Sequence, residues 1–283
     1  MKNIFYLMLF FSLSSSTMDR SNLDLKIMTF NIRYDNPDDN KNNWKYRKEE
    51  VTKMIRSNGV DILGAQEVLA NQLKYISEKL PDYNAIGVGR EDGKEKGEFS
   101  PIFYKKDKFK VGKSGYFWLS ETPEKPSKGW DAACERIATW AQLKDIKTNK
   151  MLFVINTHFD HEGMIARQES VKLIKEKVAL LSEGLPLIIM GDFNAEPESS
   201  VVKQMLSSAE AITIFDSRSR TSKVYGESWT FNGFGKVPFH QRQIIDYIFV
   251  NNDVKVKKHN ILSETVNGMF ISDHSAVFIV VSI

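Results

Sequence analysis

The sequence predicts a single α/β domain in which packed β-sheets are flanked by helices. Three observations lead to this prediction. Short apolar segments of strand length recur from residue 25 onwards, segments with helical periodicity lie between them, and no low-complexity linker or fixed-period repeat divides the 283 residues. A composition of 42% hydrophobic and 27% charged residues supplies enough apolar side chains for one large core.

Eight segments have the length and composition of β-strands. Residues 137–143 alternate loosely, as expected for a strand with one buried face, whereas residues 187–190 are continuously apolar and predict a strand covered on both faces. The predicted strands span residues 25–31, 61–66, 101–104, 137–143, 151–157, 187–190, 244–250 and 276–283.

Four further segments have helical periodicity. In one of them, Val171, Ile174 and Val178 fall three or four residues apart, which places them on one face of a helix. Helices with one apolar face would cover the sheets. The predicted helices span residues 46–56, 71–80, 165–181 and 199–206.

The N-terminus has the order of a secretory signal peptide. Lys2 precedes an apolar run over residues 4–13, and small polar residues follow at 14–17. We therefore expect residues 1–19 to be a signal peptide, residues 24–283 to form the domain, and the mature protein to be secreted or periplasmic. The apolar run is shorter than the ~20 residues that span a bilayer, and no later segment approaches that length.

Charge and cysteine content narrow the classes of protein. The 39 basic and 36 acidic side chains nearly cancel, so the total charge does not indicate a polyanion-binding protein. Cys134 is the only cysteine, which excludes an intramolecular disulfide and a thiolate metal cluster. We expect a monomer without an integral membrane segment after removal of the signal peptide.

Polar side chains stand where the apolar strands end. Asn31, Glu67 and His158 each end or follow a strand, and Asp192 and Asn194 follow another. A single such ending is ordinary, because Asp and Asn readily begin turns. Several endings gathered at one edge of the packed sheets would place these groups in one cleft, on a rigid scaffold.

The residue types in this set suit a hard divalent cation. Carboxylate, amide and imidazole groups without cysteine favour Mg²⁺ or Mn²⁺ over a structural zinc site. Mg²⁺ is usually held by one or two carboxylates and completed by water and substrate phosphate. The sequence therefore predicts a metal-dependent site for a phosphate-containing substrate.

Six short motifs follow one another along the chain: TFN at 29–31, QE at 66–67, NTH at 156–158, GDFN at 191–194, IDYIF at 245–249 and SDH at 272–274. In this order they resemble the endonuclease/exonuclease/phosphatase superfamily, which includes deoxyribonuclease-I-like nucleases and inositol polyphosphate 5-phosphatases. The resemblance extends from about residue 25 to residue 283. It implies a four-layer α/β sandwich, with two mixed sheets packed face to face and helices on both outer faces.

The resemblance also implies a metal site. Glu67 would be the principal ligand. Asn31 and Asp273 would lie nearby, as ligands or as contacts to metal-bound water, and Asn31 could equally contact the substrate phosphate. The ion would be Mg²⁺ or Mn²⁺.

The catalytic roles that the resemblance implies fall on five residues. Asp192 and Asn194 would hold the attacking water, the phosphate or a second metal. His274 would be the general base or a phosphate ligand, with its imidazole oriented by Asp246 as in a catalytic triad. His158 would contact the scissile phosphate.

Three further side chains are candidates for substrate binding. Arg136 matches a position where family members often place a basic residue towards the phosphate; a surface ion pair with Glu135 or a neighbouring residue is the alternative. His161 is expected to bind substrate rather than metal. Trp229, in a loop, is the candidate to stack on a base or cover a lipid or sugar group. His259 has no motif around it and is expected at the surface.

The predicted activity is metal-dependent hydrolysis of a phosphoester by activated water, in a phosphodiesterase or a phosphatase. The substrate would be a small molecule, a nucleotide, a lipid headgroup or a nucleic acid. A DNA endonuclease or a 3′–5′ RNA exonuclease is the alternative, disfavoured by the near-neutral charge. A catalytically inactive binding module on the same scaffold is a third interpretation, and the filled ligand positions argue against it.

Overall fold

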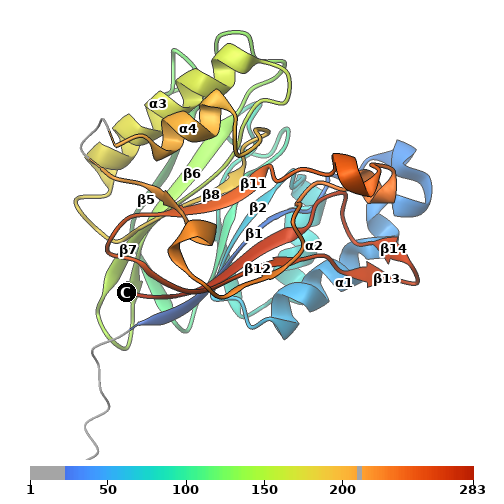
Figure 1. The fold of residues 1–283 in the computed structure, drawn as a ribbon, viewed down its shortest axis with the longest axis horizontal. Coiled ribbons are helices and arrows are strands. Elements are labelled where there is room, and N and C mark those ends of the chain that lie inside the picture. The colour runs from blue at the N-terminus through green and yellow to red at the C-terminus, as the bar shows by residue number, and fades with distance from the viewer. Residues whose placement is uncertain (1–22, 209–211) are drawn as a thin grey trace, which may run out of the picture.

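Two mixed β-sheets pack face to face between two layers of helices (Figure 1). The structure, a computed structural model, describes residues 23–208 and 212–283, so the expected signal peptide lies outside the described residues. The predicted four-layer sandwich is confirmed. In the part of the chain that the structure describes, no helix is both long and apolar enough to span a membrane.

One sheet has seven strands. Its middle strand, β1, pairs in parallel with β2 and antiparallel with β15, which makes the sheet mixed. The order is β10 (Val224–Gly226), β12 (Lys255–Leu262), β15 (Ala276–Ser282), β1 (Asp24–Asn31), β2 (Ile62–Gln66), β4 (Ile102–Lys105) and β3 (Tyr83–Ile86).

The other sheet has six strands. Its strands β7 and β8 run parallel, and the remaining neighbours are antiparallel. The order is β5 (Phe109–Trp118), β6 (Ile137–Asp145), β7 (Met151–His158), β8 (Leu187–Asp192), β11 (Asp246–Val250) and β9 (Phe215–Asp216), and a separate hairpin consists of β13 (Thr265–Val266) and β14 (Met269–Phe270).

Helices cover the outer face of each sheet (Figure 1). Those on the seven-stranded sheet are α1 (Trp44–Ser57) and α2 (Ala70–Lys79), and those on the six-stranded sheet are α3 (Met164–Leu181) and α4 (Ser200–Leu206). Alternation along β1 shows the layering: Ile27 faces the core between the sheets, and Met28 faces the core beneath α1.

All eight predicted strands and all four predicted helices are present, with ends that lie within two residues of those expected. Strand β12 was missed because lysines dominate its sequence. Its outward positions hold Lys255 and Lys257, while Val256, His259 and Ile261 are buried. The expectation that His259 lies at the surface is therefore wrong, because its side chain is on the buried face of β12.

Buried amides join the two sheets beneath the edge where the polar side chains collect. Asn156 donates from Nδ2 to the carbonyl oxygens of Ala65 at 2.8 Å and Pro101 at 2.9 Å, and its Oδ1 accepts from Gln66 Nε2 at 2.6 Å. A Cβ on Gly64 would lie 2.6 Å from Asn156 Oδ1, so glycine permits this close approach. These motif residues thus have a structural role, because they fix one sheet edge against the other.

Candidate active site

The predicted polar side chains meet at one edge of the two sheets because of strand register. Asp192, at the end of β8, is paired with His158 on β7 and with Asp246 on β11. Asn31, at the end of β1 in the opposite sheet, donates from Nδ2 to Asp192 Oδ2 at 3.0 Å. The two sheets therefore contribute side chains to a single site.

A cleft of about 580 Å³ opens above this edge. Asn31 and Asp246 are buried beneath it. Eight of the predicted residues line the cleft: Glu67, Arg136, His158, His161, Asp192, Asn194, Asp273 and His274.

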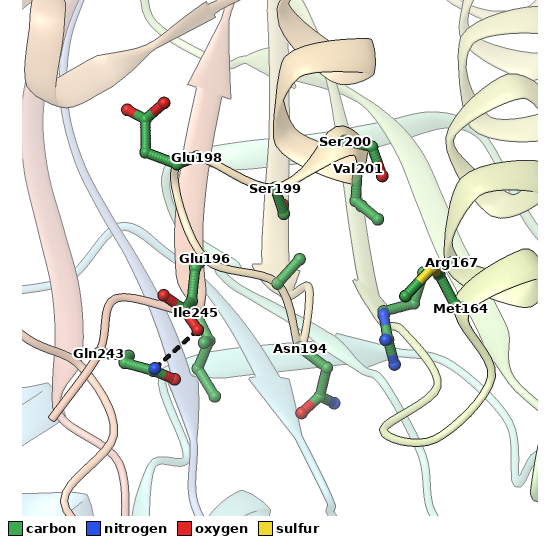
Figure 2. Close-up of a pocket in the computed structure, with 11 residues that line it drawn as sticks. Met164, Arg167, Asn194, Glu196, Glu198, Ser199, Ser200, Val201, Gln243 and Ile245 are labelled. Carbon is green, nitrogen blue, oxygen red and sulfur yellow. Dashed lines mark hydrogen bonds between the residues drawn. The ribbon is translucent and has the colours of Figure 1, made fainter. Parts of the chain in front are cut away.

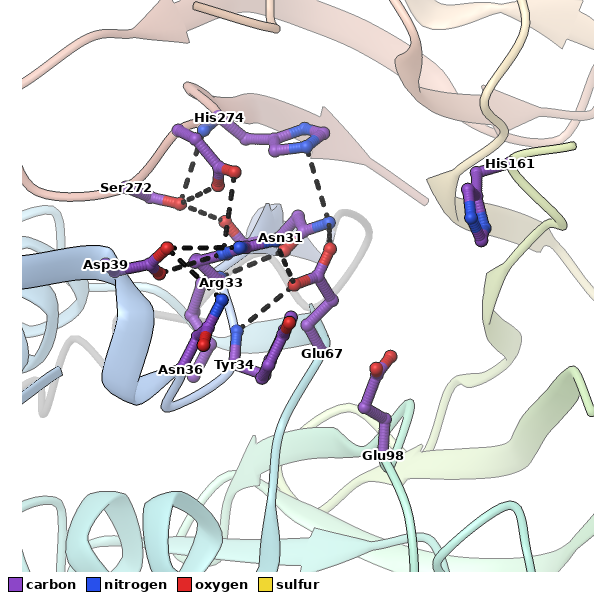
Figure 3. Close-up of polar contacts among 12 residues, drawn as sticks. Asn31, Arg33, Tyr34, Asn36, Asp39, Glu67, Glu98, His161, Ser272 and His274 are labelled. Atoms are coloured by element: carbon purple, nitrogen blue, oxygen red, sulfur yellow. Dashed lines mark hydrogen bonds and ion pairs between the residues drawn. The ribbon is translucent and has the colours of Figure 1, made fainter. Parts of the chain in front are cut away.

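Asn31 turns its amide nitrogen towards the carboxylates of the site (Figure 3). Its Oδ1 accepts from the backbone N–H of Arg33 at 3.0 Å, which fixes the orientation of the amide. Its Nδ2 donates to Glu67 Oε1 at 2.9 Å as well as to Asp192. In this arrangement Asn31 is a hydrogen-bond donor between two carboxylates, and its expected contact with a metal or with the substrate phosphate stays a prediction.

Arg33, which the sequence did not indicate, lies near the carboxylates of Glu67 and Asp273. Arg33 Nη1 is 3.8 Å from Glu67 Oε2, and Arg33 Nε is 3.8 Å from Asp273 Oδ2. Burial raises the pKa of Asp273, and the charge of Glu67 raises it further. The carboxylate oxygens of Glu67 and Asp273 are hard ligands of the kind that Mg²⁺ or Mn²⁺ prefers.

His274 and Asp246 form the predicted pair, with 2.9 Å between His274 Nδ1 and Asp246 Oδ2. Burial alone would lower the pKa of His274, but the carboxylates of Asp246 and Asp192 outweigh it and hold the pKa well above its ordinary value. Burial and the charge of Asp246 raise the pKa of Asp192 to about 7. These three side chains also approach closely enough to hold a metal ion.

The surroundings of His158 lower its pKa, whereas those of His274 raise the pKa of that residue. Burial, followed by the charges of Arg136 and Arg90, lowers the pKa of His158 well below the ordinary value, so the ring is neutral. His158 Nε2 lies 3.1 Å from Asn194 Nδ2, which also donates to a backbone carbonyl oxygen at 3.0 Å, and 3.4 Å from Asp192 Oδ2. His158 Nδ1 is 3.9 Å from Glu98 Oε2 and is buried without a hydrogen-bond partner among the described residues.

Guanidinium groups form one wall of the cleft. Arg136 is 4% exposed, and its Nε lies 3.3 Å from Asp160 Oδ2, so the alternative of a surface pair with Glu135 is wrong. Arg136 Nη2 is 2.9 Å from His161 Nδ1, which holds that exposed imidazole at the cleft. Arg90 and Glu98 were missed by the sequence reasoning; they lie on the glycine-rich loop between β3 and β4 and form a two-pronged ion pair at 2.8 and 3.0 Å.

Trp229 does not line the cleft. Its side chain is 3% exposed, the Phe270 ring packs edge-on against it at 6.1 Å, and the Arg242 guanidinium lies 4.4 Å from its ring centroid. The expectation that its ring contacts substrate is therefore corrected. Phe231 lines the cleft instead, with its ring 5.0 Å from that of His274.

Comparison with known proteins identifies the family of this chain. Residues 28–274 match the endonuclease/exonuclease/phosphatase family, and the chain belongs to that family. A family member from Bacteroides vulgatus is 42% identical, with a TM-score of 0.88 over 92% of this chain and 98% of that one. The mannosyl-6-phosphatase of Bacteroides thetaiotaomicron is 36% identical, with a TM-score of 0.84 over 91% of this chain and 99% of that one.

The chain spans less than two thirds of the curated relatives that it matches. Uncharacterized protein R895 of Acanthamoeba polyphaga mimivirus is 26% identical over 228 residues, which are 69% of this chain and 32% of that protein. Family membership makes the chain a member of a phosphoesterase superfamily.

Proposed function

We propose that this protein is a divalent-metal-dependent phosphatase that removes phosphate from a phosphorylated carbohydrate. One observation carries the phosphatase activity: the His274–Asp246 pair, the Glu67 and Asp273 carboxylates and the Arg136 guanidinium surround one cleft. The carbohydrate is supported by the similarity to the mannosyl-6-phosphatase, which extends over 99% of that chain.

Glu67 and Asp273 would hold the Mg²⁺ or Mn²⁺ ion. When bound, such an ion neutralises charge on phosphoryl oxygens and lowers the pKa of bound water. Asn31 restrains Glu67 and Asp192 through its two N–H groups. Arg33, which is anchored to Asp39 at 3.0 Å, supplies positive charge between the two metal-binding carboxylates.

Asp192 and His274 would handle the protons of the reaction. His274 Nε2 is 3.7 Å from Asp192 Oδ2. Held as an imidazolium by Asp246, His274 would donate a hydrogen bond to a phosphoryl oxygen. Asp192 would accept the proton of the attacking water as its oxygen bonds to phosphorus, and would return that proton to the sugar oxygen that leaves as the other P–O bond breaks. This assignment makes His274 a phosphate ligand rather than a general base.

Arg136 would bind the phosphate from the opposite wall. Its Nη1 is buried and has no hydrogen-bond partner among the described residues, so a donor remains for an anionic oxygen. A guanidinium group suits phosphate because its donors are planar and permanently charged.

The test compares four kinds of substrate at one Mg²⁺ concentration: mannose 6-phosphate, p-nitrophenyl phosphate, bis-p-nitrophenyl phosphate, and nucleic acid as single-stranded RNA or duplex DNA. We expect the two monoesters to have the highest kcat/KM. His274→Ala should abolish the activity, and His240→Ala, at an exposed position, should not change it. Faster cleavage of RNA or DNA than of either monoester would contradict the proposal and favour the nuclease.

We also propose that residues 1–19 are a signal peptide and that the protein is secreted or periplasmic. The apolar run after Lys2 supports this. Deletion of residues 1–19 should leave kcat unchanged, and the protein recovered from the periplasm of a bacterial host should lack them. A truncated chain that does not fold would contradict the prediction.

A further inference from the structure

A second hollow of about 370 Å³ adjoins the catalytic cleft (Figure 2). The two share Asn194, Gln243 and Ile245 in their walls, so the hollow begins where the phosphate site ends. Its far side is formed by the start of α3, at Met164 and Arg167, and by the segment that leads into α4. A substrate whose phosphate lies in the cleft can extend into this hollow.

The hollow is lined by donors and acceptors held in place. Gln243 Nε2 donates to Glu196 Oε1 at 2.6 Å, and Figure 2 shows this pair on one side with Asn194 beside it. Arg167, on the other side, is anchored by a 2.9 Å hydrogen bond from Nη1 to the carbonyl oxygen of Asp160. The second oxygen of Glu196 and the remaining guanidinium donors are available to a ligand.

Charge distinguishes this hollow from the guanidinium wall of the cleft. Its lining has the carboxylate of Glu196 and the guanidinium of Arg167, and its other carboxylate, Glu198, is exposed and paired with Lys203 at 3.2 Å. The hollow therefore has no excess of positive charge to attract a second phosphate group. A neutral group with several hydroxyls can accept from Arg167 and donate to Glu196.

We propose that this hollow is the subsite for the sugar of a phosphorylated carbohydrate, with Glu196, Gln243 and Arg167 recognising its hydroxyls. The proposal rests on the phosphatase activity proposed above and adds the residues that select the substrate. It is independent of the catalytic groups, because the hydrogen bonds of these three side chains do not involve His274, Asp246 or Glu67 among the described residues.

The test is the ratio of kcat/KM for mannose 6-phosphate to kcat/KM for methyl phosphate, which lacks a sugar. Loss of hydrogen bonds to a substrate hydroxyl should lower this ratio about tenfold in Glu196→Ala and in Gln243→Leu. Glu78→Ala, at an exposed position on α2, is the matched control and should leave the ratio unchanged. Thermal melting of each variant checks that it is folded.

The outcomes separate the two proposals. A wild-type enzyme that hydrolyses both monoesters, with a ratio that neither variant changes, would overturn the sugar subsite and leave the phosphatase intact. A wild-type enzyme that hydrolyses neither monoester would overturn both.

A small cavity behind the catalytic pair carries a second inference. Asp246 binds His274 with one carboxylate oxygen, and its other oxygen, Oδ1, is buried without a hydrogen-bond partner among the described residues. The cavity is lined by Asp246, Arg218 and His259, and Arg218 Nη1 and His259 Nδ1 are also buried and unpartnered within that part of the chain. Such groups are costly to bury without hydrogen bonds.

We infer that a bound water in this cavity connects Arg218 with Asp246 Oδ1. The cavity offers about 10 Å³ to the centres of water molecules, close to the room that one water requires, and its lining includes the three residues with an unpartnered buried atom together with Asp216. Arg218 would then be a positioning residue that holds the Asp246 carboxylate in the orientation that His274 needs. This inference also rests on the proposed role of Asp246 and His274.

The test compares Arg218→Met with Arg218→Lys. The methionine variant should lower kcat about tenfold with little change in KM. The Asp246 carboxylate loses the contact that holds its orientation, whereas the groups that bind the substrate are unchanged. Lysine, which can also donate to the water, should restore most of the rate. Arg220→Met, on the same short helix but exposed, is the control.

Three results would overturn the inference: a kcat for Arg218→Met within twofold of wild type, an equal loss in Arg220→Met, or a lysine variant as slow as the methionine variant. A high-resolution crystal structure provides a readout that does not depend on any variant being folded. It should show a water within hydrogen-bond distance of Asp246 Oδ1, and a dry cavity would contradict the inference.

Discussion

His274 and His158 lie in the same cleft, but their surroundings shift their pKa values in opposite directions. His274 faces Asp246 and Asp192, which hold its pKa high, whereas burial and the cations Arg136 and Arg90 hold that of His158 low. One histidine is therefore charged and the other neutral. Opposed shifts of this kind allow one site to hold a donor and an acceptor at the same pH.

The cations of the cleft differ in their neighbours. Arg33 lies 3.8 Å from a carboxylate oxygen of Glu67 and of Asp273. Arg136 and Arg90 instead lower the pKa of His158, and Asp192 lies near both histidines, 3.4 Å from His158 Nε2 and 3.7 Å from His274 Nε2. Substitutions of Asp246 and Arg136 therefore act first on different histidines.

The largest effect is expected from Asp246→Asn. Loss of this charge removes the partner that orients His274 and stabilises its imidazolium, so kcat should fall about 1,000-fold while the fold persists. Steady-state kinetics and circular dichroism provide the measurement. Asp253→Asn, at an exposed position between β11 and β12, is the control, and an Asp246→Asn variant with full activity would refute the pairing.

Arg136→Met should have a smaller effect, mainly on binding. The variant removes a buried guanidinium from the phosphate wall, and KM for p-nitrophenyl phosphate should rise at least about tenfold. The same change removes a cation that lowers the pKa of His158, so the acid limb of the kcat/KM profile should move to higher pH. A profile that moves to lower pH would contradict the assignment.

A third histidine affects stability rather than activity. Burial lowers the pKa of His259 to about 4, and Arg218 adds to the shift. Because the unfolded chain takes up this proton near pH 6.5 and the folded chain only near pH 4, the free energy of unfolding should fall as the pH falls between these values. The loss is at most about 3 kcal/mol.

His259→Gln should remove that part of the pH dependence, measured by denaturant unfolding at pH 7 and pH 4.5. His240→Gln, at an exposed position, should retain it. Equal pH dependence in wild type and His259→Gln would show that the buried imidazole is not responsible.

The sequence was informative where a polar residue directly ends an apolar strand. Such strand ends are found at Asn31, His158 and Asp192. The pairing of the strands places their ends at one edge. Arg33 was missed, since it adopts a left-handed backbone conformation with φ of 58° immediately after β1, and such a turn depends on its tertiary contacts. Glu67, with φ of 59°, was found only because its motif is distinctive.

Loop side chains were the least predictable. Arg90 and Glu98 become neighbours of His158 through the folding of a glycine-rich loop, and no strand periodicity encodes that approach. Trp229 was misplaced for a related reason: its loop sequence does not reveal that Phe270 and Arg242 cover its ring. Sequence patterning located the catalytic edge but not the walls above it.

The central claim is that Glu67 and Asp273 hold a divalent cation required for phosphoester hydrolysis. The most direct measurement is the hydrolysis of p-nitrophenyl phosphate as Mg²⁺ is removed with EDTA and returned, for wild type and Glu67→Gln, with Mg²⁺ binding followed by calorimetry. We predict that EDTA abolishes wild-type activity, that Mg²⁺ restores it, and that Glu67→Gln loses both binding and at least about 100-fold in kcat/KM. Activity that survives EDTA, or a Glu67→Gln enzyme that binds Mg²⁺ and turns over as wild type does, would contradict the account.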